Sequence, residues 1–213
     1  MKRILIIVVF VLLSFNMFAQ SENTITDKGY ISLGWAPAWG VGHFGDFVSE
    51  GSYRGFFLDG KGFISENIAI GGSMGWSGFY DVKDRATLNF ENVNAIQADG
   101  AVTGNLSNYY YNLPILVNVS YYPSFESFFK PYVSLGVGTV YNRLESYVGL
   151  VGVYDETWQF QMAPELGAFI PFGKDSNIGA HLAARYNYIT FQDYRFSGIS
   201  YFQLNIGVSW ILQ

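Results

Sequence analysis

From Gly29 onward, large apolar residues alternate along the chain with small or polar residues. A period of two is typical of β-strands, because successive side chains of a strand point to opposite faces. The alternation predicts eight strands, and no helical period of useful length competes with it. They are Tyr30 to Val41, Tyr53 to Ile64, Ile68 to Tyr80, Tyr109 to Tyr121, Pro131 to Asn142, Thr157 to Phe172, Ile178 to Ile189 and a last run from Phe202 to Leu212.

The connections between these strands alternate in length. The short ones are Ser65 to Asn67, Pro123 to Lys130 and Gly173 to Asn177, and the long ones are Gly42 to Ser52, Asp81 to Asn108, Arg143 to Glu156 and Thr190 to Gly198. Short turns at one end and long loops at the other are typical of outer-membrane barrels. The sequence therefore predicts an all-β fold, an eight-stranded antiparallel transmembrane β-barrel with short periplasmic turns and longer extracellular loops.

The large residues occupy the face that is uniformly apolar, which a narrow barrel interior cannot hold. A soluble barrel around an apolar ligand would show the opposite arrangement. All five tryptophans lie on this apolar face, and with several tyrosines we expect them near the strand ends on the loop side, as membrane-interface aromatics. They are Trp35, Trp39, Trp76, Trp158 and Trp210.

The opposite face carries charge and is predicted to line the lumen. Its charged and titratable residues are Asp59, Lys61, Glu165, His181 and Arg185. Glu165 and Arg185 are equally distant from Asp175 in their turn, so a symmetric hairpin sets them opposite each other. We interpret the set as a structural polar network, because an eight-stranded barrel is only wide enough for its own side chains. A polar permeation path or a catalytic cluster is the alternative.

Three prolines interrupt the predicted strands. Pro37, Pro114 and Pro164 each remove a backbone donor, and a closed barrel has no free edge for them. We expect bulges or ladder ends at Pro37 and Pro114, while Pro164 has no obvious place.

Composition narrows the class of protein. The 213 residues are 50% hydrophobic and 19% aromatic, with a formal net charge of −5. This composition excludes a disordered chain and a basic nucleic-acid binder. The absence of cysteine excludes disulfides and thiolate metal ligands.

The first residues predict a secretory signal peptide. A basic start at Lys2 and Arg3 precedes an apolar run from Ile4 to Leu13, and the small Ala19 precedes a polar segment. A membrane-anchor helix is the alternative, but Asn16 interrupts the run too early for a span of about 20 residues. We expect a signal peptide at 1–19 and a single barrel domain at 20–213 in the cell outer membrane.

Three segments carry a family resemblance. They are Leu113 to Pro123, Phe129 to Gly138 and Ala163 to Gly167. The chain resembles the small outer-membrane β-barrel proteins of Gram-negative bacteria, the group containing OmpX, OmpW and the OmpA membrane domain. The resemblance implies outer-membrane lipid and the barrel assembly machinery as partners. It departs at the C-terminus, where that family usually ends on an aromatic residue and this chain ends on Gln213.

For function, we expect a non-enzymatic protein with a structural or surface-interaction role, binding extracellular ligands through its long loops. A narrow porin-like passage for small solutes is the first alternative, suggested by small inward residues such as Gly34 and Gly71. A lipid-modifying hydrolase is the second, although neither His43 nor His181 has an outward serine partner at strand spacing. No cofactor or metal is expected, since the acidic loop residues are scattered.

Overall fold

The computed structural model describes residues 29–90, 100–123, 129–148, 151–173, 176–190 and 198–212. The expected signal peptide at 1–19 lies outside these residues. The elements are β1 Gly29–Trp35, β2 Ala38–Val41, α2 His43–Phe47, β3 Arg54–Phe63, β4 Ile68–Phe90, β5 Gly100–Tyr121, β6 Lys130–Val148, β7 Val151–Pro171, β8 Ile178–Ile189 and β9 Ile199–Leu212. Within the described ranges, no helix has both the length and the apolar character needed to cross a membrane.

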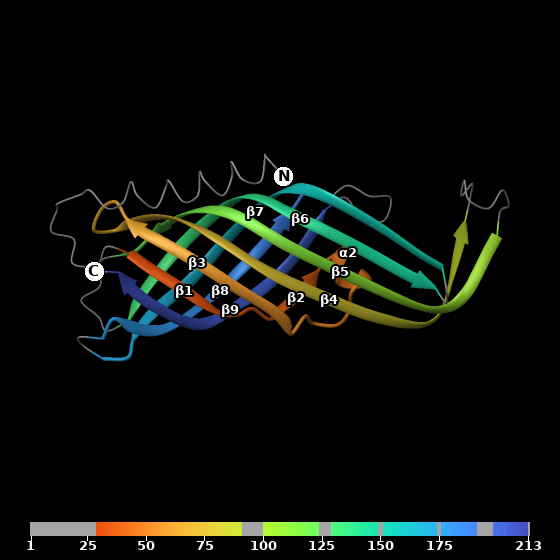
Figure 1. Cartoon of the computed structure of the whole chain (residues 1–213), viewed down its shortest axis with the longest axis horizontal. Coiled ribbons are helices and arrows are strands. Elements are labelled where there is room, and N and C mark those ends of the chain that lie inside the picture. Colours follow the sequence, from red (N-terminus) through yellow and green to blue (C-terminus); the bar gives the residue numbers. More distant parts are fainter. Residues whose placement is uncertain are drawn as a thin grey trace, which may run out of the picture.

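The strands form a closed antiparallel barrel (Figure 1), as the alternation predicts. From β3 to β9, each strand pairs with the next along the chain, while β1 pairs with β3 on one side and with β9 on the other, which closes the sheet. β1 and β2 pair with β9 in one continuous register, so they act as one strand of an eight-stranded ring. Closure pairs the backbone N–H and C=O groups along every strand edge. A sheet in lipid requires this pairing, because no water is present to form hydrogen bonds with its backbone.

The three prolines interrupt the ladders without changing the register. Pro37 lies in the gap between β1 and β2, where its carbonyl accepts a 2.9 Å hydrogen bond from the Leu204 amide. The β4–β5 ladder omits Pro114, and the β7–β8 ladder omits Pro164. The expected interruption at Pro37 and Pro114 is confirmed as ladder gaps. The irregularity in β4 and β5 lies instead between Lys83 and Ala86.

Two of the expected long loops are mostly strand. β4 to β7 contain 19 to 23 residues each, about twice the ~9–11 that a tilted strand needs to cross a membrane. The prediction of loops over Asp81 to Asn108 and Arg143 to Glu156 was therefore wrong for most of these residues. Outside lipid, hairpin pairing does not require an apolar outer face, so the alternation that marks the other strands is not needed there. We call residues 81–90, 100–108, 143–148 and 151–156 the extension.

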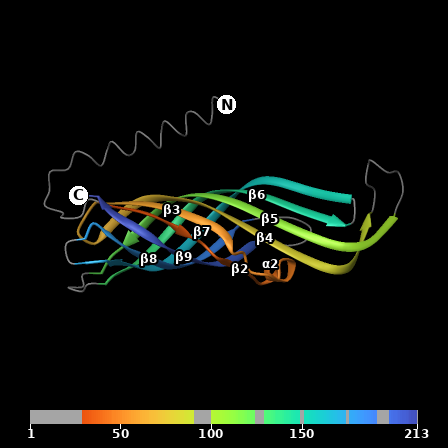
Figure 2. The same ribbon diagram turned by 60° about the horizontal axis from the view of Figure 1, so that its bottom comes forward.

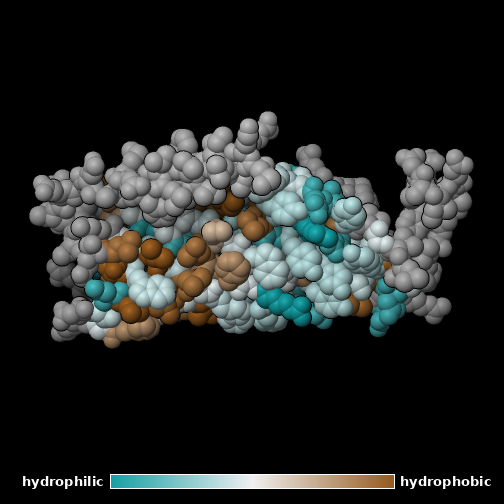
Figure 3. All heavy atoms as spheres, in the orientation of Figure 1, coloured by the Kyte–Doolittle hydropathy of each residue, from teal (hydrophilic) through white to brown (hydrophobic). Residues whose placement is uncertain are grey.

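The extension lies at the end of the barrel away from the C-terminus (Figures 1 and 2). The described connections at the other end are short, as in the hairpin between Phe63 and Ile68. In Figure 3, brown apolar surface covers much of the barrel near the short turns, while the coloured surface toward the extension is mostly pale or teal. The outward side chains of Leu33, Val117 and Leu166 are 47%, 59% and 63% exposed, which is the pattern of a lipid-facing band.

Candidate functional site

The middle of the lumen holds a connected network of charges. Asp59, Lys61, Glu165, His181 and Arg185 are all buried there. Glu165 lies directly opposite Arg185 in the β7–β8 register, and Arg185 Nη2 is 2.6 Å from Glu165 Oε2. Lys61 Nζ lies 3.4 Å from Glu165 Oε1 and 3.5 Å from Asp59 Oδ2. Two acids and two bases are thus buried together, so their charges balance one another inside the barrel.

Uncharged side chains hold this network in place. The Tyr132 hydroxyl donates to Glu165 Oε1 at 2.7 Å, and the Asn205 amide donates to Glu165 Oε2 at 3.1 Å. Asn118 donates to Asp59 Oδ1 at 3.2 Å. Sequence reasoning did not single out these partners, although each lies on the inward parity of its strand. Because Glu165 accepts bonds on both oxygens from several strands, the network ties distant strands together.

The same cluster contains three groups with metal-ligand chemistry. Ligand atoms of Asp59, Glu165 and His181 lie within 4.8 Å of one another. Lys61 and Arg185 already engage both carboxylates, so a metal ion would compete with two cations for the same oxygens. We therefore interpret the cluster as an internal ion-pair network.

His181 faces the lumen and has polar contacts on both ring nitrogens. Nε2 lies 3.2 Å from the Tyr132 hydroxyl and Nδ1 lies 3.5 Å from Ser209 Oγ. Ser209 also contacts Ser32 across the β1–β9 seam. These hydroxyls are buried inside the barrel, away from the lipid-facing surface.

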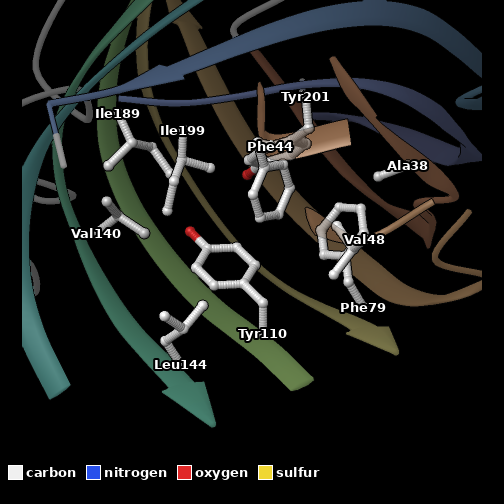
Figure 4. Packing of buried hydrophobic residues seen from close by; sticks show 10 residues of the cluster. All are labelled: Ala38, Phe44, Val48, Phe79, Tyr110, Val140, Leu144, Ile189, Ile199 and Tyr201. Atoms are coloured by element: carbon white, nitrogen blue, oxygen red, sulfur yellow. The ribbon is translucent and has the colours of Figure 1, made fainter. Parts of the chain in front are cut away.

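Apolar clusters pack on either side of the charged network. Toward the short turns, Tyr30 and Phe169 have ring centroids 4.8 Å apart, and other aromatic rings surround them. Toward the extension, a second cluster fills the lumen (Figure 4). It consists of Ala38, Phe44, Val48, Phe79, Tyr110, Val140, Leu144, Ile189, Ile199 and Tyr201. The described lumen is therefore filled by side chains at both ends.

The segment from Gly42 to Ser52 folds into the barrel mouth. Helix α2 places Phe44 in edge contact with Phe79 and Tyr110, at centroid distances of 5.3 and 4.9 Å (Figure 4). Ser49 Oγ donates to Asp81 at 2.7 Å, which fixes the segment to β4. The prediction of this segment as an exposed contact loop was therefore wrong in part. Its two buried apolar side chains, Phe44 and Val48, drive it inward with the partly buried Phe47, while His43 and Asp46 remain exposed.

The tryptophans lie on the outer surface. Trp35, Trp158 and Trp210 are 46%, 57% and 42% exposed, while Trp39 and Trp76 are half-buried by neighbouring residues. The expectation that all five lie on the loop side was wrong for Trp210, which pairs with Ile178 at the short-turn end. The tryptophans are thus distributed over both ends of the barrel.

No family model matches the sequence, and no curated protein matches it significantly. Solved structures do match. Ail, the attachment invasion locus protein of Yersinia pestis, is 10% identical with a TM-score of 0.52, over 87% of this chain and 99% of that one. Neisserial surface protein A is 14% identical with a TM-score of 0.53, over 87% and 97%. At these identities the similarity concerns the fold, and the chain has the fold of the small outer-membrane β-barrel proteins.

Proposed function

We propose that this chain is a closed outer-membrane barrel that acts at the cell surface through its extension. In this proposal residues 1–19 are a cleaved signal peptide and residues 20–213 form the barrel. The barrel assembly machinery inserts it, and outer-membrane lipid surrounds its apolar band. The observation that carries the proposal is the combination of a filled lumen with four strands that reach far beyond the band.

The filled lumen argues against passage of a solute. Asn142, Gln161 and Asn205 face the interior and are 0% exposed, so no water-sized space adjoins them. The small inward residues that suggested a pore have another explanation. A Cβ on Gly34 would collide with the Ile206 carbonyl, and one on Gly71 would collide with the Gly60 carbonyl. Close approach of neighbouring strands therefore requires these glycines.

The structure also gives little support to the lipid hydrolase. A serine hydrolase needs a nucleophile that both contacts its base and meets its substrate. Ser209 contacts the His181 ring, but it is 1% exposed and inside the lumen. A lipid on the outer surface has no access to it.

The first test is conductance of the protein purified from membranes of cells that express the full chain. We expect planar bilayers that contain the folded protein to remain silent. Discrete openings that change with Glu165→Gln/Arg185→Gln would reject the closed barrel, because those residues line the lumen.

The second test asks whether surface binding requires the extension. Val82 pairs with Ser107, so replacing residues 83–106 with an Asn-Gly turn shortens the hairpin while preserving its register. Cells that display the full or the shortened barrel are compared on arrays of purified matrix proteins and glycans. We expect binding by the full barrel and its loss in the shortened one. Equal binding by both would contradict a role for the extension.

A further inference from the structure

An aromatic ladder runs along the outside of β4, β5 and β6 from the apolar band to the base of the extension. It consists of Trp76, Tyr80, Tyr109, Tyr111 and Tyr147. Trp76 stacks on Tyr111 with centroids 6.0 Å apart and planes 16° apart, and Tyr111 stacks on Tyr109 at 6.3 Å and 17°. Tyr109 also contacts Tyr80 at 4.8 Å and Tyr147 at 6.0 Å. The ladder is therefore a continuous aromatic surface contributed by three strands.

Only the part of this ladder near Trp76 belongs to the membrane interface. Tyr80 lies four residues beyond Trp76 along β4, which at ~3.3 Å per residue places it roughly 13 Å further along the strand. Charged residues share the outward face at this level. Arg143 lies between Glu145 and Glu156, and its guanidinium pairs with both carboxylates. Such charges are costly within hydrocarbon, so this part of the ladder lies above it.

The upper ladder borders an open groove lined by Ser107, Tyr109, Tyr111, Glu145 and Tyr147. Glu145 points outward in β6 yet is only 9% exposed, because the neighbouring side chains cover it. Its Oε2 accepts a 3.0 Å hydrogen bond from the Tyr147 hydroxyl, and this bond raises the pKa of Tyr147. The groove thus combines flat aromatic faces with a carboxylate held in a fixed position.

This combination suits one class of ligand. The face of an aromatic ring is electron-rich and attracts the polarised C–H groups on the flat side of a sugar ring. Beside the groove, the exposed side chains of Arg143 and Glu156 offer charge-assisted hydrogen bonds to sugar hydroxyls, and bonds of this kind are stronger than neutral ones. We propose that the ladder binds the saccharide portion of an outer-leaflet glycolipid.

The location of the ladder supports a glycolipid as the source of the sugar. Trp76 and Tyr111 are continuous with the lipid-facing band, so a glycolipid packed against the barrel would present its sugars directly along Tyr109 and Tyr80. This inference goes beyond the role proposed for the extension, because Trp76, Tyr80, Tyr109 and Tyr111 lie outside it.

The test uses the full-length barrel in detergent and two probes, purified lipopolysaccharide and its delipidated oligosaccharide. We expect both probes to bind wild type. Tyr109→Ala and Tyr147→Ala should each weaken oligosaccharide binding about fivefold, the scale of one lost aromatic contact. Tyr188→Ala is the matched control, because Tyr188 is an outward, 41% exposed tyrosine on β8, away from the ladder. Heat-modifiable migration in gels shows that each variant is folded.

Three outcomes would overturn the inference. The first is lipopolysaccharide binding that the ladder variants leave unchanged, since lipid contact alone would then explain it. The second is absence of oligosaccharide binding by folded wild type. The third is an unrelated neutral glycan such as dextran binding as tightly as the oligosaccharide, which would identify free glycans as the ligand. The hairpin-shortened barrel retains Tyr80 and Tyr109. The oligosaccharide test of the ladder and the binding test of the extension can therefore fail independently of each other.

Discussion

Glu165 on β7 and Arg185 on β8 face each other inside the barrel, and the guanidinium approaches the carboxylate to 2.6 Å. Both side chains are almost completely buried, so each neutralises a charge that would otherwise be isolated from water. Breaking a buried pair by removing one partner costs ~3–5 kcal/mol. We therefore expect Arg185→Gln to lower the free energy of unfolding by about that amount, measured by urea unfolding in micelles.

The double variant Glu165→Gln/Arg185→Gln is the control for this prediction. It leaves Asp59 beside Lys61 as a neutral pair, so we expect it to be more stable than Arg185→Gln alone. A double variant that loses the sum of both single effects would show that the two residues act independently.

The barrel closes where Gly34 of β1 pairs with Gly207 of β9. A Cβ on either glycine would collide with the backbone of the other strand. We expect Gly207→Ala to block closure, observed as loss of heat-modifiable migration in gels. Gly60→Ala is the matched control, since a Cβ at Gly60 meets nothing within 4 Å. Equal folding of the two variants would contradict a sterically closed seam.

Phe44 anchors the inward-folded segment of the barrel mouth. It is 1% exposed and touches Phe79 and Tyr110, so Phe44→Ala should cost ~3–5 kcal/mol, as for other buried phenylalanines. We expect a lower urea midpoint and faster proteolysis between His43 and Ser52. Phe56→Ala, at an outward residue that is 45% exposed, should leave proteolysis of this segment unchanged.

The outward tryptophans should show fluorescence quenching that depends on their depth in the membrane. Single-tryptophan variants that retain Trp158 or Trp210 should both be quenched by brominated lipids, because both side chains face outward. Lipids brominated in only one leaflet should separate them, since Trp210 lies at the short-turn end and Trp158 at the end that carries the extension. Identical quenching from one leaflet would contradict this placement.

The alternation along the chain was sufficient to predict the barrel. In a strand that crosses lipid, successive side chains face lipid and the barrel lumen in turn, so the pattern indicates which face each residue occupies. Every backbone group must also be paired, so the sheet has to close into a barrel. The same reasoning predicted the consecutive hairpins, and it predicted that Glu165 and Arg185 lie opposite each other. These features depend on residues that are near in sequence, or on a rule that applies to every strand.

Other features were decided by contacts between strands that are distant in sequence. Outside lipid, the outward residues of a strand can be as polar as those of a loop, so residues 81–90 and 100–108 gave no signal for the paired strands that they form. The inward fold of Phe44 depends on the space left by Phe79 and Tyr110. The Tyr109–Tyr147 contact depends on the register between β5 and β6. Sequence determined which residues face lipid or lumen, while the tertiary structure decided which of them meet, because register and packing are properties of the closed ring.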